Sequence, residues 1–106
     1  MSGVKEISVD QLKKMIDRKD AFLLLDVREK IELKYGKISV SKNIPMSELS
    51  KRLDELSKDR KIVVMCRSGK RSAKVRDSLN AEGFSATSVY GGILAWKKYD
   101  ASIISY

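Results

Sequence analysis

The residues best suited to chemistry lie in the stretch Cys66-Arg67-Ser68-Gly69-Lys70-Arg71-Ser72, which holds the only cysteine of the 106-residue chain. The apolar run Lys61-Ile62-Val63-Val64-Met65 before it is typical of a strand buried on both faces of a parallel sheet. The residues after it, Ala73 to Glu82, predict a helix that stops at Gly83. The cysteine is therefore expected between a strand and a helix N-terminus, where backbone N–H groups and the helix dipole favour an anion such as a thiolate.

Several groups in this stretch would favour the thiolate of Cys66. A free cysteine with a pKa near 8.5 is only about 3% ionised at pH 7. Gly69 can adopt positive φ, which lets successive amides turn toward the sulfur. The other contributors are three cations (Arg67, Lys70 and Arg71) and two hydroxyl donors that could also cap the helix (Ser68 and Ser72).

The simpler interpretation is that Cys66 is an inert core residue and that the basic residues form a solvated face, because free cysteine is among the most buried residue types. The preceding strand, the glycine and three cations within five residues favour the reactive interpretation instead.

Histidine is absent from the chain. A Cys–His pair, an imidazole base and a histidine-based metal site are thereby excluded, so activation must come from cations and backbone amides. No metal and no cofactor are expected.

Length and composition bound the remaining possibilities. We expect one domain over residues 1–106, because the chain suffices for a single core. A lone cysteine forms no internal disulfide, so nothing ties the fold to an oxidising compartment. The longest apolar runs reach only about five residues, and no apolar signal segment is visible. A soluble cytoplasmic protein without membrane contact is therefore expected. The formal charge of +8 suits small anions. The scattered lysines and non-interleaved aromatics argue against nucleic acid.

Short strands alternate with helical segments along the chain. Strands are predicted at Val4–Ile7, Ala21–Leu25, Asn43–Ile44, Lys61–Met65 and Ala86–Val89. Helical segments are predicted after Ser8 through about Arg18, at Lys30–Tyr35, at Ser47–Leu56, at Ala73–Glu82 and after Gly91-Gly92. This alternation predicts an α/β fold, with a small five-stranded, mainly parallel sheet and helices on both faces.

A second group of residues is expected at the same edge of the sheet as the cysteine. Asp26-Val27-Arg28 follows the second predicted strand, and ligands of such sheets lie beyond the carboxyl ends of the strands. Asp26 and Arg28 could support the site directly or form a structural ion pair, and the sequence favours neither. Trp96 is interpreted as core or pocket wall, because indole offers one donor and a large apolar surface.

Three motifs together resemble the single-domain rhodanese (thiosulfate sulfurtransferase) family over nearly the whole chain. The first is Leu25-Asp26-Val27-Arg28-Glu29, with Glu32, Gly36, Ile38 and Asn43-Ile44-Pro45 beyond it. The other two are the Cys66–Ser72 loop and Gly91-Gly92-Ile93-Leu94-Ala95-Trp96. The chain departs from the family at Gly36-Lys37-Ile38-Ser39-Val40-Ser41, where Lys37 replaces the customary histidine and the usual proline and glycine are missing.

The resemblance implies a ping-pong sulfur transfer. The Cys66 thiolate would attack the outer sulfur of thiosulfate, release sulfite and retain a persulfide, which cyanide or a small thiol would then accept. Arg67, Lys70 and Arg71 would hold the anionic donor and the leaving sulfite, while the loop amides would stabilise the persulfide anion. Ser68, Gly69 and Ser72 would complete the substrate-binding loop. An alternative with the same chemistry is a carrier that takes sulfur from a protein partner and hands it to another.

Two further alternatives differ in substrate. A cysteine phosphatase or arsenate reductase uses a similar cradle, but its signature places arginine after five intervening residues, and here four separate Cys66 from Arg71. The mercaptopyruvate branch of the family has a less basic loop than this one. Both alternatives are therefore less favoured than sulfur transfer from thiosulfate.

Overall fold

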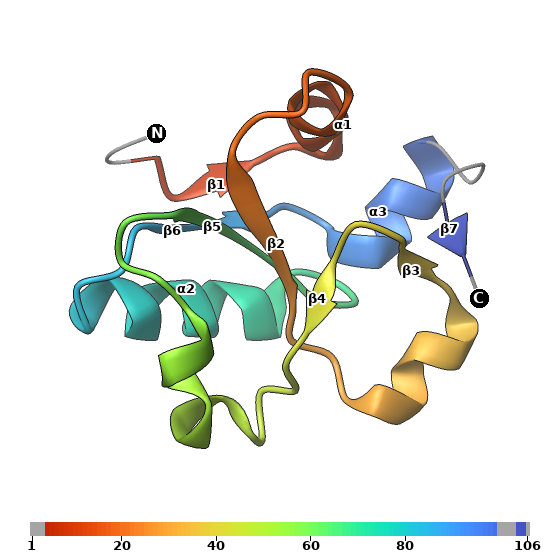
Figure 1. Cartoon of the computed structure of the whole chain (residues 1–106). Helices are drawn as coiled ribbons and strands as arrows, with labels where there is room; N and C mark the ends of the chain where they lie inside the picture. Colours follow the sequence, from red (N-terminus) through yellow and green to blue (C-terminus); the bar gives the residue numbers. More distant parts are fainter. Residues whose placement is uncertain (1–3, 100–103, 106) are drawn as a thin grey trace.

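The computed structural model describes residues 4–99 and 104–105. Its main sheet has five parallel strands. In spatial order they are β1 (Glu6–Ile7), β6 (Ala86–Val89), β5 (Lys61–Met65), β2 (Phe22–Asp26) and β4 (Lys42–Asn43) (Figure 1). All five predicted strands are confirmed: two have the predicted bounds, and the other three differ from them by one or two residues. The central strand is β5, the one that leads into the cysteine.

Helices cover both faces of the sheet, as the sequence predicts. The α-helices are α1 (Val9–Asp17), α2 (Lys70–Ala81) and α3 (Gly92–Tyr99). One core cluster joins α1 and α3 to the sheet and includes Trp96, which is fully buried. The other joins α2 to the opposite face. Because β5 contributes alternate residues to both clusters, its apolar run is continuous, and the predicted burial on both faces is confirmed.

The first helix begins as its sequence predicts. The Ser8 hydroxyl accepts a hydrogen bond from the Gln11 amide at 3.1 Å, and the Gln11 side chain accepts one from the Ser8 amide at 2.8 Å. This reciprocal capping box satisfies two N–H groups that the helix leaves without intrahelical partners. Leu12 and Met15 then face the core.

The continuous helix predicted at Ser47–Leu56 is wrong. The chain forms two 3₁₀ turns there, η2 (Leu49–Lys51) and η3 (Leu53–Glu55), separated by Arg52 with φ −125°. The Arg52 side chain bonds Glu48 and Glu55, one on each side of the break. Leucine spacing suggested a helical face, but two short turns bring the same side chains to the core, with Leu49 buried and Leu53 packed against its cluster.

A small antiparallel pair, absent from our prediction, lies next to the main sheet. The 3₁₀ helix η1 (Lys30–Tyr35) ends at Gly36 as expected, and β3 (Lys37–Ile38) then pairs with β7 (Ile104–Ser105). Lys37, the residue that departs from the family pattern, is therefore part of a strand and opposite Ser105. No helix in the described part of the chain is long and apolar enough to cross a bilayer.

Strand register brings the two expected chemical segments together. Asp26 of β2 is opposite Met65 of β5, and the Val27 amide donates to the Met65 carbonyl at 2.9 Å. Residues 26–28 therefore lie directly beside Cys66 at the carboxyl edge of the sheet. Parallel pairing makes this juxtaposition unavoidable once both strands form.

Candidate functional site

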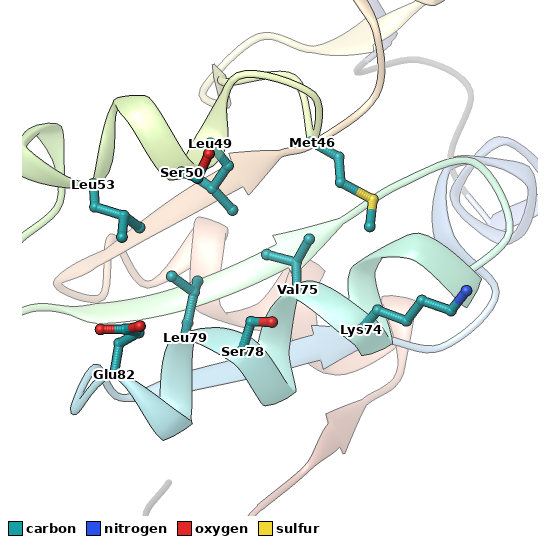
Figure 2. Close-up of a pocket in the computed structure, with 9 residues that line it drawn as sticks. All are labelled: Met46, Leu49, Ser50, Leu53, Lys74, Val75, Ser78, Leu79 and Glu82. Atoms are coloured by element: carbon teal, nitrogen blue, oxygen red, sulfur yellow. The ribbon is translucent and has the colours of Figure 1, made fainter.

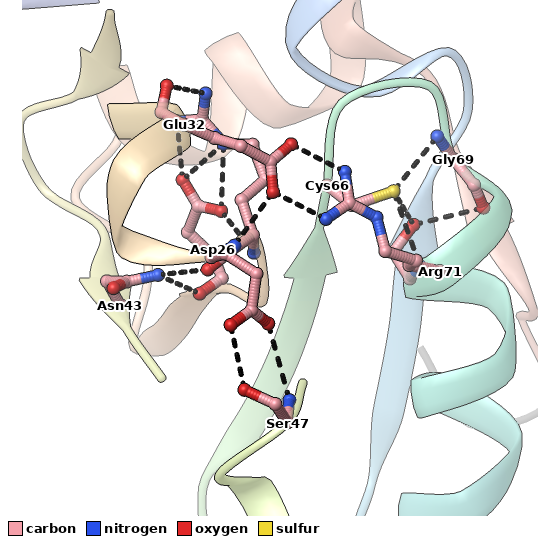
Figure 3. A network of polar contacts seen from close by, with 10 residues as sticks. Asp26, Glu32, Asn43, Ser47, Cys66, Gly69 and Arg71 are labelled. Carbon is pink, nitrogen blue, oxygen red and sulfur yellow. Dashed lines mark hydrogen bonds and ion pairs between the residues drawn. The ribbon is translucent and has the colours of Figure 1, made fainter. Parts of the chain in front are cut away.

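The sulfur of Cys66 lies against the first turn of α2 and accepts backbone N–H groups from it. Gly69 N is 3.1 Å and Ser72 N is 3.4 Å from Sγ (Figure 3). Helix α2 starts at Lys70 after Gly69, which has φ +104°, rather than at Ala73 as predicted. Neither Ser68 nor Ser72 caps the helix; the sulfur takes the place of the capping side chain, because it accepts the N–H of the third helical residue.

These contacts determine the pKa of the Cys66 thiol. Burial alone would raise that pKa, since Cys66 is only 1% exposed. Hydrogen bonds from the Ser72 hydroxyl and from the amides of Ser72, Gly69 and Ser68 outweigh burial and lower the pKa. The Ser72 oxygen is 3.5 Å from the sulfur and 3.1 Å from the Gly69 carbonyl oxygen. The thiolate is therefore favoured by hydrogen bonds, of which the one from the Ser72 hydroxyl contributes most and those from the loop amides, which the sequence analysis expected, add to it.

Helix α3 fixes the backbone of the same loop from the opposite side. The amide of Ile93 donates to the Cys66 carbonyl at 2.9 Å, and the amide of Leu94 donates to the Arg67 carbonyl at 3.1 Å. Gly92, with φ +56°, comes so close that a β-carbon there would be 2.3 Å from the Cys66 carbonyl oxygen. Because both carbonyls are bonded to α3, the loop amides remain available to the sulfur.

Arg71, one of the three predicted anion-binding cations, forms an ion pair with Glu32 of η1. Its two terminal nitrogens are 2.6 and 2.8 Å from the carboxylate oxygens (Figure 3). Hydrogen bonds from Arg71 lower the pKa of Glu32 to about 2, although partial burial opposes the shift. The pKa of Arg71 is raised, chiefly by Glu32 and to a lesser extent by the charge of Cys66. The guanidinium therefore links the Glu32 carboxylate to the thiol electrostatically.

Asp26 and Arg28 form a buried ion pair, 1% and 2% exposed. Arg28 Nη2 is 2.8 Å from Oδ2 of Asp26 and 2.9 Å from the Gly36 carbonyl oxygen, while Nη1 donates to the Glu32 carbonyl at 3.3 Å. The side-chain amide nitrogen of Asn43 donates to the backbone carbonyls of Asp26 and Arg28, each at 2.9 Å. Of the two roles that the sequence left open, these contacts support the structural one, because Arg28 braces the segment that presents Glu32 to Arg71.

The remaining predicted site residues are exposed around the sulfur. Arg67, Ser68 and Lys70 face solvent, and within residues 4–99 neither Arg67 nor Lys70 is paired with a carboxylate. A groove of about 420 Å³ opens beside Arg67. It is lined by Arg28, Glu32, Tyr35, Arg67, Ile93, Leu94 and Lys97. The structure therefore brings Cys66, Gly69 and Ser72 into contact. It leaves the cations Arg67 and Lys70 of the same loop exposed to solvent.

A second groove, of about 280 Å³, lies between α2 and the two 3₁₀ turns (Figure 2). Its lining is mostly apolar and consists of Met46, Leu49, Ser50, Leu53, Lys74, Val75, Ser78, Leu79 and Glu82. None of the loop residues 66–72 lines it, so it is separate from the thiol. Among the described residues, no group of three or more histidine, cysteine, aspartate or glutamate side chains is placed to hold a metal ion.

Comparison with known proteins identifies the family of this chain. The family model described as "Rhodanese-like domain" matches residues 8–99. The chain belongs to the rhodanese-like domain family. "Putative sulfurtransferase YtwF" of Bacillus subtilis is 38% identical over 89% of this chain and 91% of its own length. A protein of Allochromatium vinosum named "Sulfurtransferase" is 32% identical over 96% of both chains.

A solved structure has the same fold. The rhodanese-related protein of Thermoplasma volcanium superposes with a TM-score of 0.82 at 38% identity, covering 90% of this chain and 92% of that one. Together with the sulfurtransferase relatives, this likeness makes the protein a rhodanese-like member of a sulfurtransferase family. The predicted resemblance and fold class are confirmed.

Two features of this rhodanese-like site escaped the sequence analysis. Glu32 was part of the first motif, yet nothing in the sequence indicated that it pairs with Arg71, 39 positions away. The backbone bonds from α3 to the loop involve amides that every residue carries, so only Gly91-Gly92 signalled a close approach there.

The hydroxyl of Ser72 can be tested as a stabiliser of the thiolate. Replacing Ser72 by alanine removes one hydrogen-bonding group from the sulfur, so the pKa of Cys66 should rise and the thiolate fraction at neutral pH should fall about threefold. Titration of the thiolate ultraviolet absorbance measures this directly. Ser68→Ala is the matched control, because it removes an exposed hydroxyl and keeps the amide; an equal rise in both variants would contradict the assignment.

Gly92→Ala tests the contact between α3 and the loop. Its β-carbon would collide with the Cys66 and Arg67 carbonyls, so we expect a loss of at least about 2 kcal/mol in unfolding free energy together with a higher thiol pKa. Gly83→Ala, at φ +93° with only Lys58 side-chain atoms nearby, should lower stability but leave the thiol pKa unchanged. Urea unfolding and thiol titration give both quantities, and a normal thiol pKa in a folded Gly92→Ala protein would rule out the proposed constraint.

The buried ion pair predicts a large cost when one partner is removed. Asp26→Asn leaves the Arg28 charge buried without its counter-ion and should destabilise the protein by about 3–5 kcal/mol. Asp20→Asn, which removes the exposed partner of Arg18, should leave the urea midpoint nearly unchanged. Similar midpoints for the two variants would show that burial of the Asp26 pair contributes little.

Proposed function

We propose that this protein is a sulfurtransferase that carries sulfane sulfur on Cys66 as a persulfide. The observation that supports this most directly is the cage around Sγ, where the amides of Gly69 and Ser72 donate at 3.1 and 3.4 Å. Such donors stabilise an anionic sulfur without a general base, and the chain has no histidine to act as one. A thiolate nucleophile and a persulfide anion need the same surroundings.

The transfer from thiosulfate has two balanced half-reactions. The Cys66 thiolate attacks the outer sulfur of thiosulfate, a sulfur–sulfur bond forms, and the bond to the sulfonate group breaks. Sulfite leaves with that electron pair, and the persulfide anion remains on the enzyme. An acceptor such as cyanide or a small thiol then attacks the outer sulfur and restores the Cys66 thiolate.

The exposed cations of the Cys66 loop, Arg67 and Lys70, support an anionic sulfur donor. Arg67 and Lys70 are exposed at the start of α2, where the helix dipole adds to their field. Cations in this place would attract a sulfur donor that carries negative charge and would hold the departing sulfite.

Phosphate chemistry fits this loop less well. A phosphatase of this type needs an arginine free to bind the equatorial oxygens of the phosphoryl group. Here the Arg71 guanidinium is bound through both terminal nitrogens to Glu32. The short spacing from Cys66 and the occupied arginine therefore both favour sulfur as the transferred group.

Intact mass spectrometry under non-reducing conditions tests the proposal. After incubation with thiosulfate the protein should gain one sulfur atom, and cyanide should remove it. Cys66→Ser is the variant of choice, because its hydroxyl can still accept the helix amides, and it should never gain sulfur. An equal gain of sulfur in the wild-type protein and in Cys66→Ser would contradict the assignment.

The same measurement separates the donors. If thiosulfate fails but a cysteine desulfurase with cysteine loads Cys66, the protein is a carrier fed by a protein partner rather than a thiosulfate enzyme. If neither donor loads it, hydrolysis of an aryl phosphate becomes the decisive assay, and activity that requires Cys66 would replace sulfur transfer by phosphatase chemistry.

A further inference from the structure

The second groove, between α2 and the two 3₁₀ turns, brings apolar surface to the outside of the protein away from the thiol. Its volume is about 280 Å³, and its lining includes Val75 and Leu79, which also pack in the core. Met46, 37% exposed, and half-buried Leu53 lie on the side opposite α2 (Figure 2). The apolar core therefore reaches the surface along this side of α2, and a molecule that covers the groove would remove that area from water.

The α2 side of this groove carries two opposite charges, placed symmetrically about a small residue. Lys74, Ser78 and Glu82 follow one another at intervals of four residues, so they lie along one side of the helix, and all three line the groove (Figure 2). Lys74 and Glu82 are about 12 Å apart along the helix axis, because each residue advances the helix by about 1.5 Å. This separation is too large for an ion pair between them within one chain.

The side chains of Lys74 and Glu82 have no partner of opposite charge in the described part of the chain. Within residues 4–99, the ion pairs involve other side chains, including that of Asp77 on the same helix, which pairs with Arg76. A partner that covers the groove can therefore gain from an acidic group opposite Lys74 and a basic group opposite Glu82.

A second copy of this chain offers those two groups in the required order. When two α2 helices cross antiparallel at Ser78, the twofold axis places Lys74 of each copy opposite Glu82 of the other. Serine is small, so the helix axes can approach to about 8 Å, the lower end of the range for packed helices. The charge pattern of this groove is therefore complementary to itself.

The net charge of the protein does not oppose association at this place. The formal charge of +8 makes two copies repel one another in general. The second groove is an exception, since its lining carries one lysine and one glutamate and is neutral as a whole. Two copies can therefore meet here without bringing an excess of like charge together.

We propose that the second groove is a self-association surface, on which a second copy of this chain packs its own α2 antiparallel to form a twofold-symmetric dimer. Burial of Met46 and Leu53 from both copies stabilises the contact, and the two ion pairs fix its orientation. The inference goes beyond the proposed function, because residues 66–72 do not line the groove, and it holds whichever donor loads Cys66.

Sedimentation velocity over a concentration series tests the inference on the full chain. The wild-type protein should change from monomer to dimer between about 1 μM and 1 mM, the range expected for a small interface. Lys74→Glu and Glu82→Lys should each weaken the dimer at least about tenfold, because each creates two like-charge contacts across the twofold axis. The double variant Lys74→Glu/Glu82→Lys restores opposite charges and should regain the wild-type affinity to within about threefold.

The matched control for these variants is Asp77→Lys. It changes the net charge as much as Glu82→Lys does and lies on the same helix, but Asp77 does not line the groove, so the dimer should form as in the wild-type protein. The charge changes at 74 and 82 also keep α2 intact, since they place the acid nearer the helix N-terminus and the cation at its C-terminus. Equal urea midpoints verify this.

Cysteine cross-linking locates the twofold axis. Ser78→Cys in a Cys66→Ser background has a single thiol, and residue 78 of one copy meets residue 78 of the other at the crossing. Mild oxidation with copper–phenanthroline should therefore give a disulfide-linked dimer on a non-reducing gel. Ala81→Cys in the same background is the control, because Ala81 is exposed on α2 outside the groove lining, and it should stay largely monomeric.

Three results would overturn the inference. The first is a wild-type protein that stays monomeric over the whole concentration range. The second is a dimer that neither single charge variant weakens, because its interface then lies elsewhere. The third is a double variant as weak as the single ones, which would exclude the antiparallel pairing of Lys74 with Glu82. Sulfur loading of Cys66 is a separate measurement, so failure of the proposed function leaves each of these results interpretable.

Discussion

Everything at this site depends on how the peptide groups that follow Cys66 are oriented. Two amides of α3 bind the carbonyls of residues 66 and 67, and the amides of Gly69 and Ser72 in the following turn donate to the sulfur. The close approach requires glycine at position 92, because any β-carbon would overlap the loop backbone. A helix distant in sequence thus determines the electrostatic surroundings of the thiol without contributing a side chain to them.

The charged side chains around the loop form a connected arrangement rather than a loose cluster of cations. Asp26 neutralises buried Arg28, Arg28 bonds the η1 backbone, and η1 presents Glu32 to Arg71. The loop is therefore less positive than its sequence suggests, and its exposed cations are Arg67 and Lys70.

The order of strands and helices and the position of the cysteine were predictable because they follow from local periodicity and from the rule that parallel strands end at one edge. The Ser47–Leu56 error has a physical origin, since leucine spacing reports which side chains are buried but not whether one helix or two 3₁₀ turns bury them. The pairing of Glu32 with Arg71 could not be predicted, because it depends on where the 3₁₀ helix η1 lies relative to the Cys66 loop. The sequence analysis named cations, backbone amides and hydroxyls as possible activators, and the hydrogen bonds from the Ser72 hydroxyl and from the amides of Ser72, Gly69 and Ser68 are the ones that lower the pKa of Cys66.

The sulfur that begins α2 also couples proton binding to folding. A thiolate accepts amide hydrogen bonds more strongly than a thiol, which is why the pKa of Cys66 in the folded protein lies below that of the unfolded chain. By thermodynamic linkage, this group contributes its full stabilisation above the pKa of an unfolded cysteine, about 8.5. The contribution declines as the pH falls and is lost once the pH drops through the folded pKa. The ionised form that can act as a nucleophile is therefore also the form in which the fold is most stable.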